Sequence, residues 1–91
     1  MSDSAAVREL RRQLGRQLAA ARKAAGYGQR DFARRISYAR STLSTVESGI
    51  QRAGRAFWEA CDEVLGTSGQ LALGYDQIRA QQAAERQTPA R

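Results

Sequence analysis

The sequence predicts an all-α domain of five helices, and three observations support this prediction. Apolar residues recur three and four positions apart along most of the chain, which is the spacing of one helix face. Glycines interrupt this pattern where helices are expected to end. The single proline, Pro89, lies too near the C-terminus to break an earlier helix. The 91 residues are enough for one small core.

A long first helix is expected from Ala5 to Ala25, with Asp3 or Ser4 as the candidate N-cap. Gly15 is expected to be tolerated inside this helix, and Gly26 is a natural C-terminal stop. The expected apolar stripe consists of Val7, Leu10, Leu14, Leu18, Ala21 and Ala25.

Four arginines of the first helix lie largely off this stripe: Arg8, Arg11, Arg12 and Arg16. They have two interpretations, contact with DNA phosphates or a minor groove, and a solvated helix face. The solvated face is favoured for Arg8, whereas Arg12 and Arg16 fit both interpretations equally.

Two short helices follow, separated by a small break near residues 37–39. The earlier one, after Gly28, places Phe32, Ala33 and Ile36 on a narrow apolar face. In the later one Leu43 and Val46 point inward, and four residues with hydrogen-bonding groups point outward: Arg40, Ser41, Ser44 and Thr45. Two short helices joined by a tight turn, with a polar outer face on the second, are what a helix-turn-helix needs to enter the major groove.

A fourth helix is expected from Gly54 or Arg55 to Leu65, because its apolar positions fall on one face: Phe57, Trp58, Cys61, Val64 and Leu65. Gly66 should end it, and Ser68 is a candidate N-cap for a fifth helix. That helix, weakened by Gly74, gathers four residues on one side: Leu71, Tyr75, Ile78 and Gln82. This side either mediates self-association or closes the core of the monomer. Residues 87–91 are expected to be a disordered tail.

Composition excludes several classes of function. The chain has no histidine and one cysteine, so it offers no zinc-finger ligand set, no disulfide framework and no activated nucleophile. Cys61 is expected to be a buried structural thiol. No apolar run approaches the length of a membrane span. We therefore expect no enzyme, no metal, no cofactor and no membrane association, and a cytoplasmic location.

The net charge of +6 is unevenly distributed. Residues 1–55 carry 12 basic and 4 acidic side chains, whereas residues 56–91 carry 3 basic and 5 acidic ones. The basic half contains the two short helices, which suits a phosphate-facing side with an opposite side left for a partner. The alternative is that these charges only solvate exposed helices.

The stretch from Gln29 to Gly49 resembles the Cro/C1-type helix-turn-helix domain of phage repressors and bacterial XRE-type regulators. The resemblance rests on Gln29, on Phe32-Ala33, and above all on the run Ser-Thr-Leu-Ser-Thr-Val-Glu-Ser-Gly that ends at Gly49. It covers roughly residues 12 to 66. It implies a lambda-repressor-like fold with four regions: a helix extension (1–12), the helix-turn-helix domain (13–66), a C-terminal helix with a candidate dimerisation role (67–86) and a tail (87–91).

The resemblance also implies roles for individual residues. Glu47 is expected to pair with Arg22 late in the first helix. The outward residues Arg40, Ser41, Ser44 and Thr45 are expected to contact DNA bases. Contacts with DNA phosphates are expected from Gln29, Arg30, Thr42, Gln51 and Arg52.

The chain departs from the family pattern in the loops. Ser37 replaces the usual glycine of the turn, and Ala39 replaces the serine that usually caps the third helix. Ala53-Gly54 stand where the family has a proline. These departures predict a strained turn at Ser37 and a looser loop after the third helix, with the fold unchanged.

The expected function is sequence-specific binding of double-stranded DNA by a transcriptional regulator, a repressor that acts as a homodimer on an inverted repeat in the nucleoid. One alternative is an antitoxin or adaptor that binds a protein partner through residues 56–86 and uses DNA binding for autoregulation. Another is a non-specific architectural DNA binder, whose affinity would be similar on any sequence.

Overall fold

The computed structural model describes residues 3–87, which form five α-helices and no strand. The helices are α1 (Ala5–Ala24), α2 (Gln29–Ile36), α3 (Arg40–Glu47), α4 (Arg55–Leu65) and α5 (Gln70–Gln87). The predicted all-α, five-helix fold is therefore confirmed. Of the tail expected at 87–91, residue 87 ends α5, and residues 88–91 lie outside the described part of the chain.

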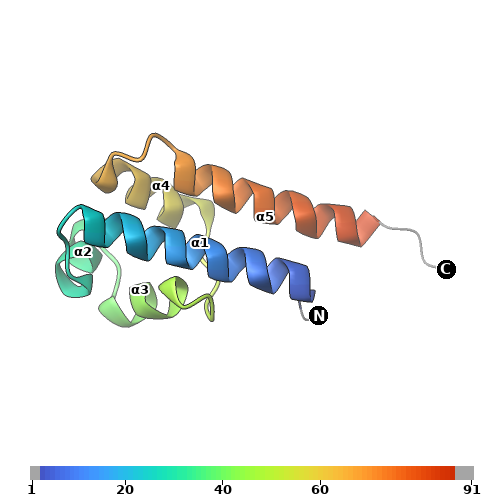
Figure 1. The fold of residues 1–91 in the computed structure, drawn as a ribbon, viewed down its shortest axis with the longest axis horizontal. Helices are drawn as coiled ribbons and strands as arrows, with labels where there is room; N and C mark the ends of the chain where they lie inside the picture. Colours follow the sequence, from blue (N-terminus) through green and yellow to red (C-terminus); the bar gives the residue numbers. More distant parts are fainter. Residues whose placement is uncertain (1–2, 88–91) are drawn as a thin grey trace.

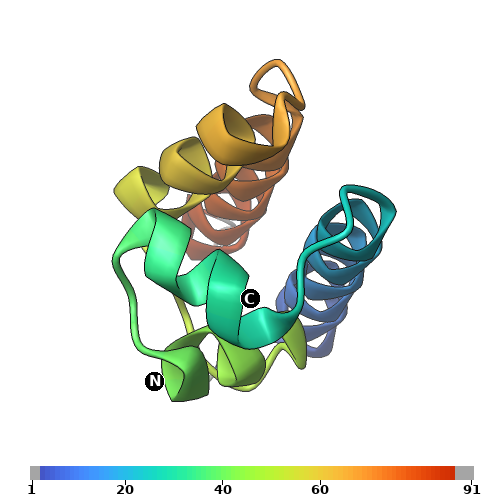
Figure 2. The same ribbon diagram turned by 90° about the vertical axis from the view of Figure 1, so that its left-hand side faces the viewer.

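The two long helices, α1 and α5, lie along the long axis of the molecule and run in opposite directions (Figure 1). α5 packs against both α1 and α4, while α3 packs against α1 and α2. Figure 2 shows α2 and α3 grouped at one side of the body, apart from α5. None of the helices in residues 3–87 has both the length and the apolar character needed to cross a bilayer.

The core takes residues from every helix, and all of them except Ala72 lie at positions that the apolar spacing predicts. α1, α2 and α3 contribute Val7, Leu14, Leu18, Phe32, Ala33, Ile36, Leu43 and Val46. α4 and α5 contribute Phe57, Trp58, Cys61, Leu71, Ala72 and Ile78. The apolar side of α5 thus closes the core of the monomer. The prediction that Ala25 belongs to the apolar stripe of α1 is wrong, because α1 ends at Ala24 and Ala25 is exposed.

The α4–α5 junction differs from the prediction at the start of α5. Ser68 was the candidate N-cap, but it has a φ of 54° and makes no capping bond. Asp62 of α4 caps the helix instead: its two carboxylate oxygens accept hydrogen bonds from the backbone N–H groups of Leu71 and Ala72, both at 2.9 Å. Asp62 is consequently buried, and Thr67 also donates its hydroxyl to it.

Gly15 has a structural role that the sequence did not reveal. It is buried where α1 crosses the end of α3, and a Cβ added there would lie 2.4 Å from the carbonyl oxygen of Glu47 and 2.7 Å from that of Val46. Only a residue without a side chain allows this approach. Gly15 is thus a packing residue and not only a tolerated interruption of the helix.

Candidate nucleic-acid interface

The turn between α2 and α3 has the strained residue that the sequence predicts. Ser37 has φ 63° and ψ 41°, the left-handed region usually occupied by glycine. The ring of Tyr38 packs edge-on against Phe57, with 5.0 Å between ring centroids. These contacts tie the turn to α4. Ala39 then precedes α3 without any side-chain cap, as expected for alanine.

α3 has one buried and one open side. Leu43 and Val46 are almost completely buried, whereas Arg40 and Ser41 are exposed. Ser44 is half-buried. Within residues 3–87 the Arg40 guanidinium has no acidic partner, and its five N–H donors are free for an external acceptor.

Thr45 is less available than Arg40. Its hydroxyl lies 3.0 Å from the carbonyl oxygens of both Ser41 and Thr42 and 2.5 Å from Oε1 of Gln51. A hydroxyl has one proton, so these acceptors compete for it. The contact with Gln51 connects α3 to the loop that follows it. Thr45 therefore has to give up an internal hydrogen bond before its hydroxyl can donate to a base.

A buried ion pair fixes α3 to α1. Nε of Arg22 donates to one carboxylate oxygen of Glu47 at 2.7 Å, and a terminal nitrogen donates to the other at 3.1 Å. Arg22 also donates to the carbonyl of Tyr27 at 2.9 Å. Both side chains of the pair are 7% exposed. The contact expected from the family resemblance is thus present, with the fork geometry that favours arginine over lysine.

The side chain of Gln29 joins the same carboxylate. Its Nε2 donates to Oε1 of Glu47 at 2.9 Å, so the expected phosphate ligand is held inside the protein through its amide. Gly28 caps α2 without a side-chain bond, which leaves the backbone N–H groups of the first turn uncapped. These donors point toward a position where an anion is favoured. Asp31 in the same turn is exposed and opposes an anion there.

Of the other expected phosphate ligands, Arg30 is exposed on α2 and Thr42 is half-buried on α3. Arg52 is 64% exposed and forms an ion pair with Asp3 at 3.2 Å. The guanidinium of Arg11 binds the same Asp3 carboxylate and, as the larger effect, lowers the pKa of Asp3 below its ordinary value. Arg52 thus reaches the N-terminal segment of the chain.

The arginines of α1 whose role was open form surface ion pairs. Arg12 and Arg16 each lie 3.3 Å from a carboxylate oxygen of Glu9, and all three side chains are largely exposed. On α2, Arg34 is exposed, and the guanidinium of Arg35 lies over the ring of Tyr27 at 5.4 Å from its centroid. The exposed ion pairs of Arg12 and Arg16 with Glu9 contribute little to the stability of the fold.

The order and geometry of α2 and α3 are those of a helix-turn-helix, with the second helix exposing a polar side. A family model described as a helix-turn-helix domain matches residues 13–73. The chain belongs to this helix-turn-helix domain family. The match begins at the predicted domain start and extends past residue 66 into the first turn of α5. Comparisons with curated proteins and with solved structures gave no match.

The structure has a second polar region, mostly outside residues 13–73, that the sequence did not predict. The cluster of Asp3, Arg11, Arg52 and Gln82 joins residues from both ends of the chain, since the amide of Gln82 also donates to Asp3 at 3.2 Å. Arg11 stood out in the sequence only as a residue off the apolar stripe. Its partners depend on the antiparallel packing of α1 and α5, which the local pattern does not specify.

Proposed function

We propose that this helix-turn-helix domain is a Cro/C1-type, XRE-like transcriptional regulator that binds double-stranded DNA in a sequence-specific way. The observation that supports this most directly is the open N-terminal face of α3, where the Arg40 guanidinium has no partner among residues 3–87. The buried pair of Arg22 and Glu47 holds that face in a fixed orientation. A rigid helix with a free guanidinium at its exposed start suits insertion into a major groove.

Arg40 is proposed to be the main determinant of base preference. A guanidinium can donate two hydrogen bonds to O6 and N7 of one guanine, the commonest specific contact in the major groove. Ser41 and Ser44 then contact neighbouring base edges. Thr45 contributes once its hydroxyl leaves Gln51, and its methyl group suits contact with a thymine methyl.

Phosphate contacts are proposed on both sides of α3. On one side the uncapped N-terminus of α2, with Gln29 and Arg30, faces one strand. On the other side Thr42 and the loop residues Gln51 and Arg52 face the second strand. Such contacts set the position of the protein on DNA without reading sequence.

A single recognition helix reads few base pairs, so we propose a homodimer on an inverted repeat with half-sites about one helical turn apart. Binding to such an operator in the nucleoid would repress by excluding other proteins from the promoter. The apolar side of α5 is buried within the monomer, and Leu73 is the large apolar residue that α5 leaves exposed, at 50%. The dimer contact is therefore proposed to depend on DNA rather than on an extended α5 interface.

The alternative partner-binding function through residues 56–86 has the same limited apolar surface available to it. It predicts that the chain co-purifies with the product of a neighbouring gene. A stable stoichiometric complex of this kind, together with weak sequence preference, would favour the antitoxin or adaptor function over the regulator.

Selection of bound sequences from a random DNA pool tests the proposal. The expected result is an enriched inverted repeat that binds about 10³-fold or more tightly than random DNA at physiological salt. Equal binding to all sequences, with the salt dependence of phosphate contacts alone, would instead identify a non-specific architectural protein.

On the selected site, Arg40→Ala should weaken binding by about 1–3 kcal/mol and relax the preference at one base pair. Arg30→Ala should weaken specific and random binding by a similar factor, because it is proposed to contact phosphate only. An equal loss on both DNAs for Arg40→Ala would place Arg40 on the backbone.

A further inference from the structure

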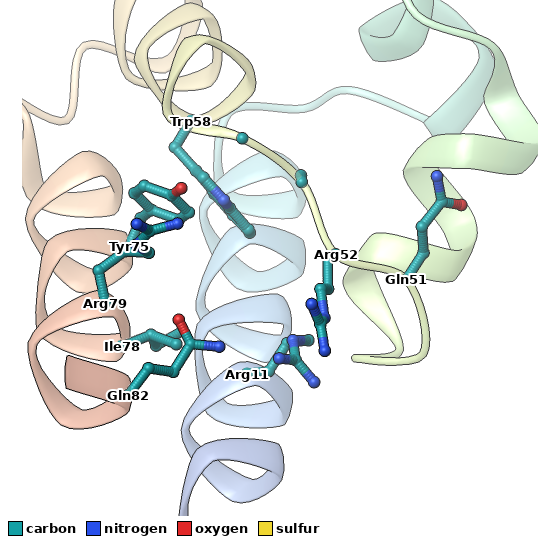
Figure 3. Close-up of a pocket in the computed structure, with 10 residues that line it drawn as sticks. Arg11, Gln51, Arg52, Trp58, Tyr75, Ile78, Arg79 and Gln82 are labelled. Carbon is teal, nitrogen blue, oxygen red and sulfur yellow. The ribbon is translucent and has the colours of Figure 1, made fainter. Parts of the chain in front are cut away.

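A pocket of about 260 Å³ lies between α1, α5 and the loop that follows α3 (Figure 3). Apolar side chains from α4 and α5 line one part of it: Trp58, Tyr75 and Ile78. The volume is just below the range of about 300–1,000 Å³ that is usual for small-molecule sites. The pocket therefore suits a compact organic molecule.

The charged residues that line the pocket all have the same sign. They are three arginines from three elements, Arg11 on α1, Arg52 in the loop and Arg79 on α5, and no acidic residue lines it in the described part of the chain. Asp3, which does not line the pocket, binds Arg11 and Arg52. Arg79 has no acidic partner within residues 3–87. Two of the three guanidinium groups thus share one carboxylate, and the third has none.

Asp3 shows which chemistry these groups accept. Its carboxylate takes an ion pair from Arg11, another from Arg52 at 3.2 Å, and a hydrogen bond from the Gln82 amide at 3.2 Å. Three donors from three separate elements, all of which line the pocket, therefore converge on one carboxylate. The Arg79 guanidinium is left for a second carboxylate. Convergent polar groups around an apolar pocket are the usual signature of a ligand site.

We propose that this pocket binds a compact aromatic carboxylate, whose ring lies against Trp58 and Tyr75 and whose carboxylate pairs with Arg79 and Arg52. The excess of positive charge in the lining favours an anion, and the aromatic lining favours a planar apolar group over a simple inorganic ion.

The pocket is also connected to the DNA-binding region. Gln51 and Arg52 line it, and Gln51 accepts the hydroxyl hydrogen bond of Thr45 in α3. A ligand that engages Arg52 removes one proposed phosphate contact and shifts the loop attached to Thr45. The ligand should therefore weaken DNA binding, a consequence that rests on the proposed function, whereas ligand binding itself does not.

Trp58 makes the test direct, because it is the only tryptophan of the chain and lines the pocket. Titration of the free protein with 3-phenylpropionate should change its fluorescence in a saturable way. The uncharged 3-phenylpropionamide should bind about tenfold or more weakly, and acetate, which has the charge without the ring, should also bind weakly. Equal affinity for the amide, equal affinity for acetate, or no saturable change would overturn the proposed ligand class.

Substitutions locate the site. Arg79→Gln should weaken 3-phenylpropionate binding about fivefold to tenfold, since it removes a charge-assisted bond at an exposed residue that the fold does not need. Arg86→Gln, which removes an exposed charge of α5 that does not line the pocket, should leave affinity unchanged. Equal effects of the two variants would mean that only net charge matters and would overturn the site.

Asp3→Asn provides a test in the opposite direction. It frees Arg11 and Arg52 from their internal carboxylate, so affinity for 3-phenylpropionate should rise several-fold. Damage to the fold cannot produce such a gain. Unchanged or reduced affinity would show that Asp3 and the ligand do not share the guanidinium groups, against the proposal.

The DNA arm is measured separately on the selected operator. Saturating 3-phenylpropionate should lower operator affinity about threefold or more, and operator should lower ligand affinity by the same factor, because coupling between two sites is reciprocal. Ligand binding with unchanged operator affinity would overturn the regulatory part. A protein that binds the ligand but no DNA would overturn the proposed function and leave the site intact.

Discussion

Two junctions of the fold each bury one carboxylate, and they stabilise it by different means. At the α1–α3 junction Glu47 is buried and is bound by the guanidinium of Arg22. At the α4–α5 junction Asp62 is 7% exposed, and backbone N–H groups of α5 bind both of its oxygens. Glu47 depends on a side chain that is distant in sequence, whereas Asp62 depends on backbone N–H groups, which are present at the start of a helix whatever its side chains.

The difference determines how each junction fails. Removal of one member of a buried ion pair leaves an uncompensated charge, whereas removal of a helix cap leaves unpaired N–H groups that carry only partial charge. Loss of one member of the ion pair should cost more stability, but removal of the other charged side chain as well should restore most of it. Loss of the helix cap should cost less stability, but no second substitution restores it, because the unpaired groups belong to the backbone.

The largest expected effect is at the α1–α3 junction. Arg22→Ala or Glu47→Ala should each lower the free energy of unfolding by about 3–5 kcal/mol. The pair Arg22→Met with Glu47→Leu should recover most of that loss, because no charge is then buried at this junction. Urea unfolding followed by circular dichroism measures both. Arg34→Ala, at an exposed position of α2, is the control and should change stability by less than about 0.5 kcal/mol. A single-variant cost as small as that of the control would contradict the role given to the pair.

Asp62→Ala should have the next largest effect and lower the free energy of unfolding by about 2 kcal/mol, because the first turn of α5 loses its cap and two N–H groups lose their acceptor. Asp62→Asn keeps one acceptor oxygen and should cost less. Hydrogen exchange at the amides of Leu71 and Ala72 should accelerate before that of the rest of α5. Glu63→Ala, at the exposed neighbouring position, is the control. Unchanged protection of the two amides would show that Asp62 does not cap α5.

Two glycines of the long helices sharpen the comparison further. Gly15→Ala should destabilise by about 1–2 kcal/mol despite the better helix propensity of alanine, because the new Cβ meets the backbone of α3. Gly74→Ala meets instead a methyl group of Leu14, at 2.6 Å, and the end of a side chain shifts at lower cost than a backbone carbonyl does. Gly74→Ala should therefore be close to neutral. Thermal unfolding of the two variants side by side measures the contrast, and equal effects would refute it.

The last effect is absent near neutral pH and concerns Cys61, which lies in the core. Burial is the main cause that raises the pKa of its thiol from 9.0 to about 12, and the charges of Asp62 and Glu47 add to it. Above pH 9 the unfolded chain therefore releases this proton while the folded chain keeps it. Stability should fall between about pH 9 and pH 12 and be unaffected by this group below pH 9.

The measurement is the difference in stability between the wild-type chain and Cys61→Ala across that range. The variant loses some packing at all pH values, but its alkaline slope should be shallower. Asp62→Asn should lower the thiol pKa, seen as faster alkylation at high pH. Parallel slopes for the two chains would mean that the Cys61 thiol ionises equally in both states.

The helices and most of the core were predictable because their signals are local. The spacing of Val7, Leu14 and Leu18, for example, identifies the inner face of α1 without any knowledge of its neighbours. Ala25 fails this rule because Gly26, with a φ of 84°, ends the helix just before the stripe is complete. Periodicity thus predicts a face well and a helix end less well.

The site was predictable only in part. The contact between Arg22 and Glu47 followed from the family resemblance, and no spacing rule would have paired residues 25 positions apart. An acid inside a helix pattern, such as Asp62, ordinarily indicates an exposed position, so the nearer Ser68 was the natural candidate for the cap. The roles of individual residues in DNA contact stay predictions.

The features that depend on how helices cross were not predictable. Gly15 is required because α3 ends against that turn of α1, and the arginine-lined pocket exists because α1, α5 and the loop after α3 meet at one place. Each contributing residue looks ordinary in its own segment. Tertiary packing alone brings them together.

The attachment of Gln29 and Arg22 to the same carboxylate has a consequence for the duplex. In the proposed complex, the phosphate-binding start of α2 and the base-contacting helix α3 move as one rigid body. The protein therefore has little freedom to adjust to an imperfect site. The DNA has to bend or twist to meet both surfaces. Bases that no side chain touches, at the centre of the operator, would then influence affinity through the flexibility of their steps.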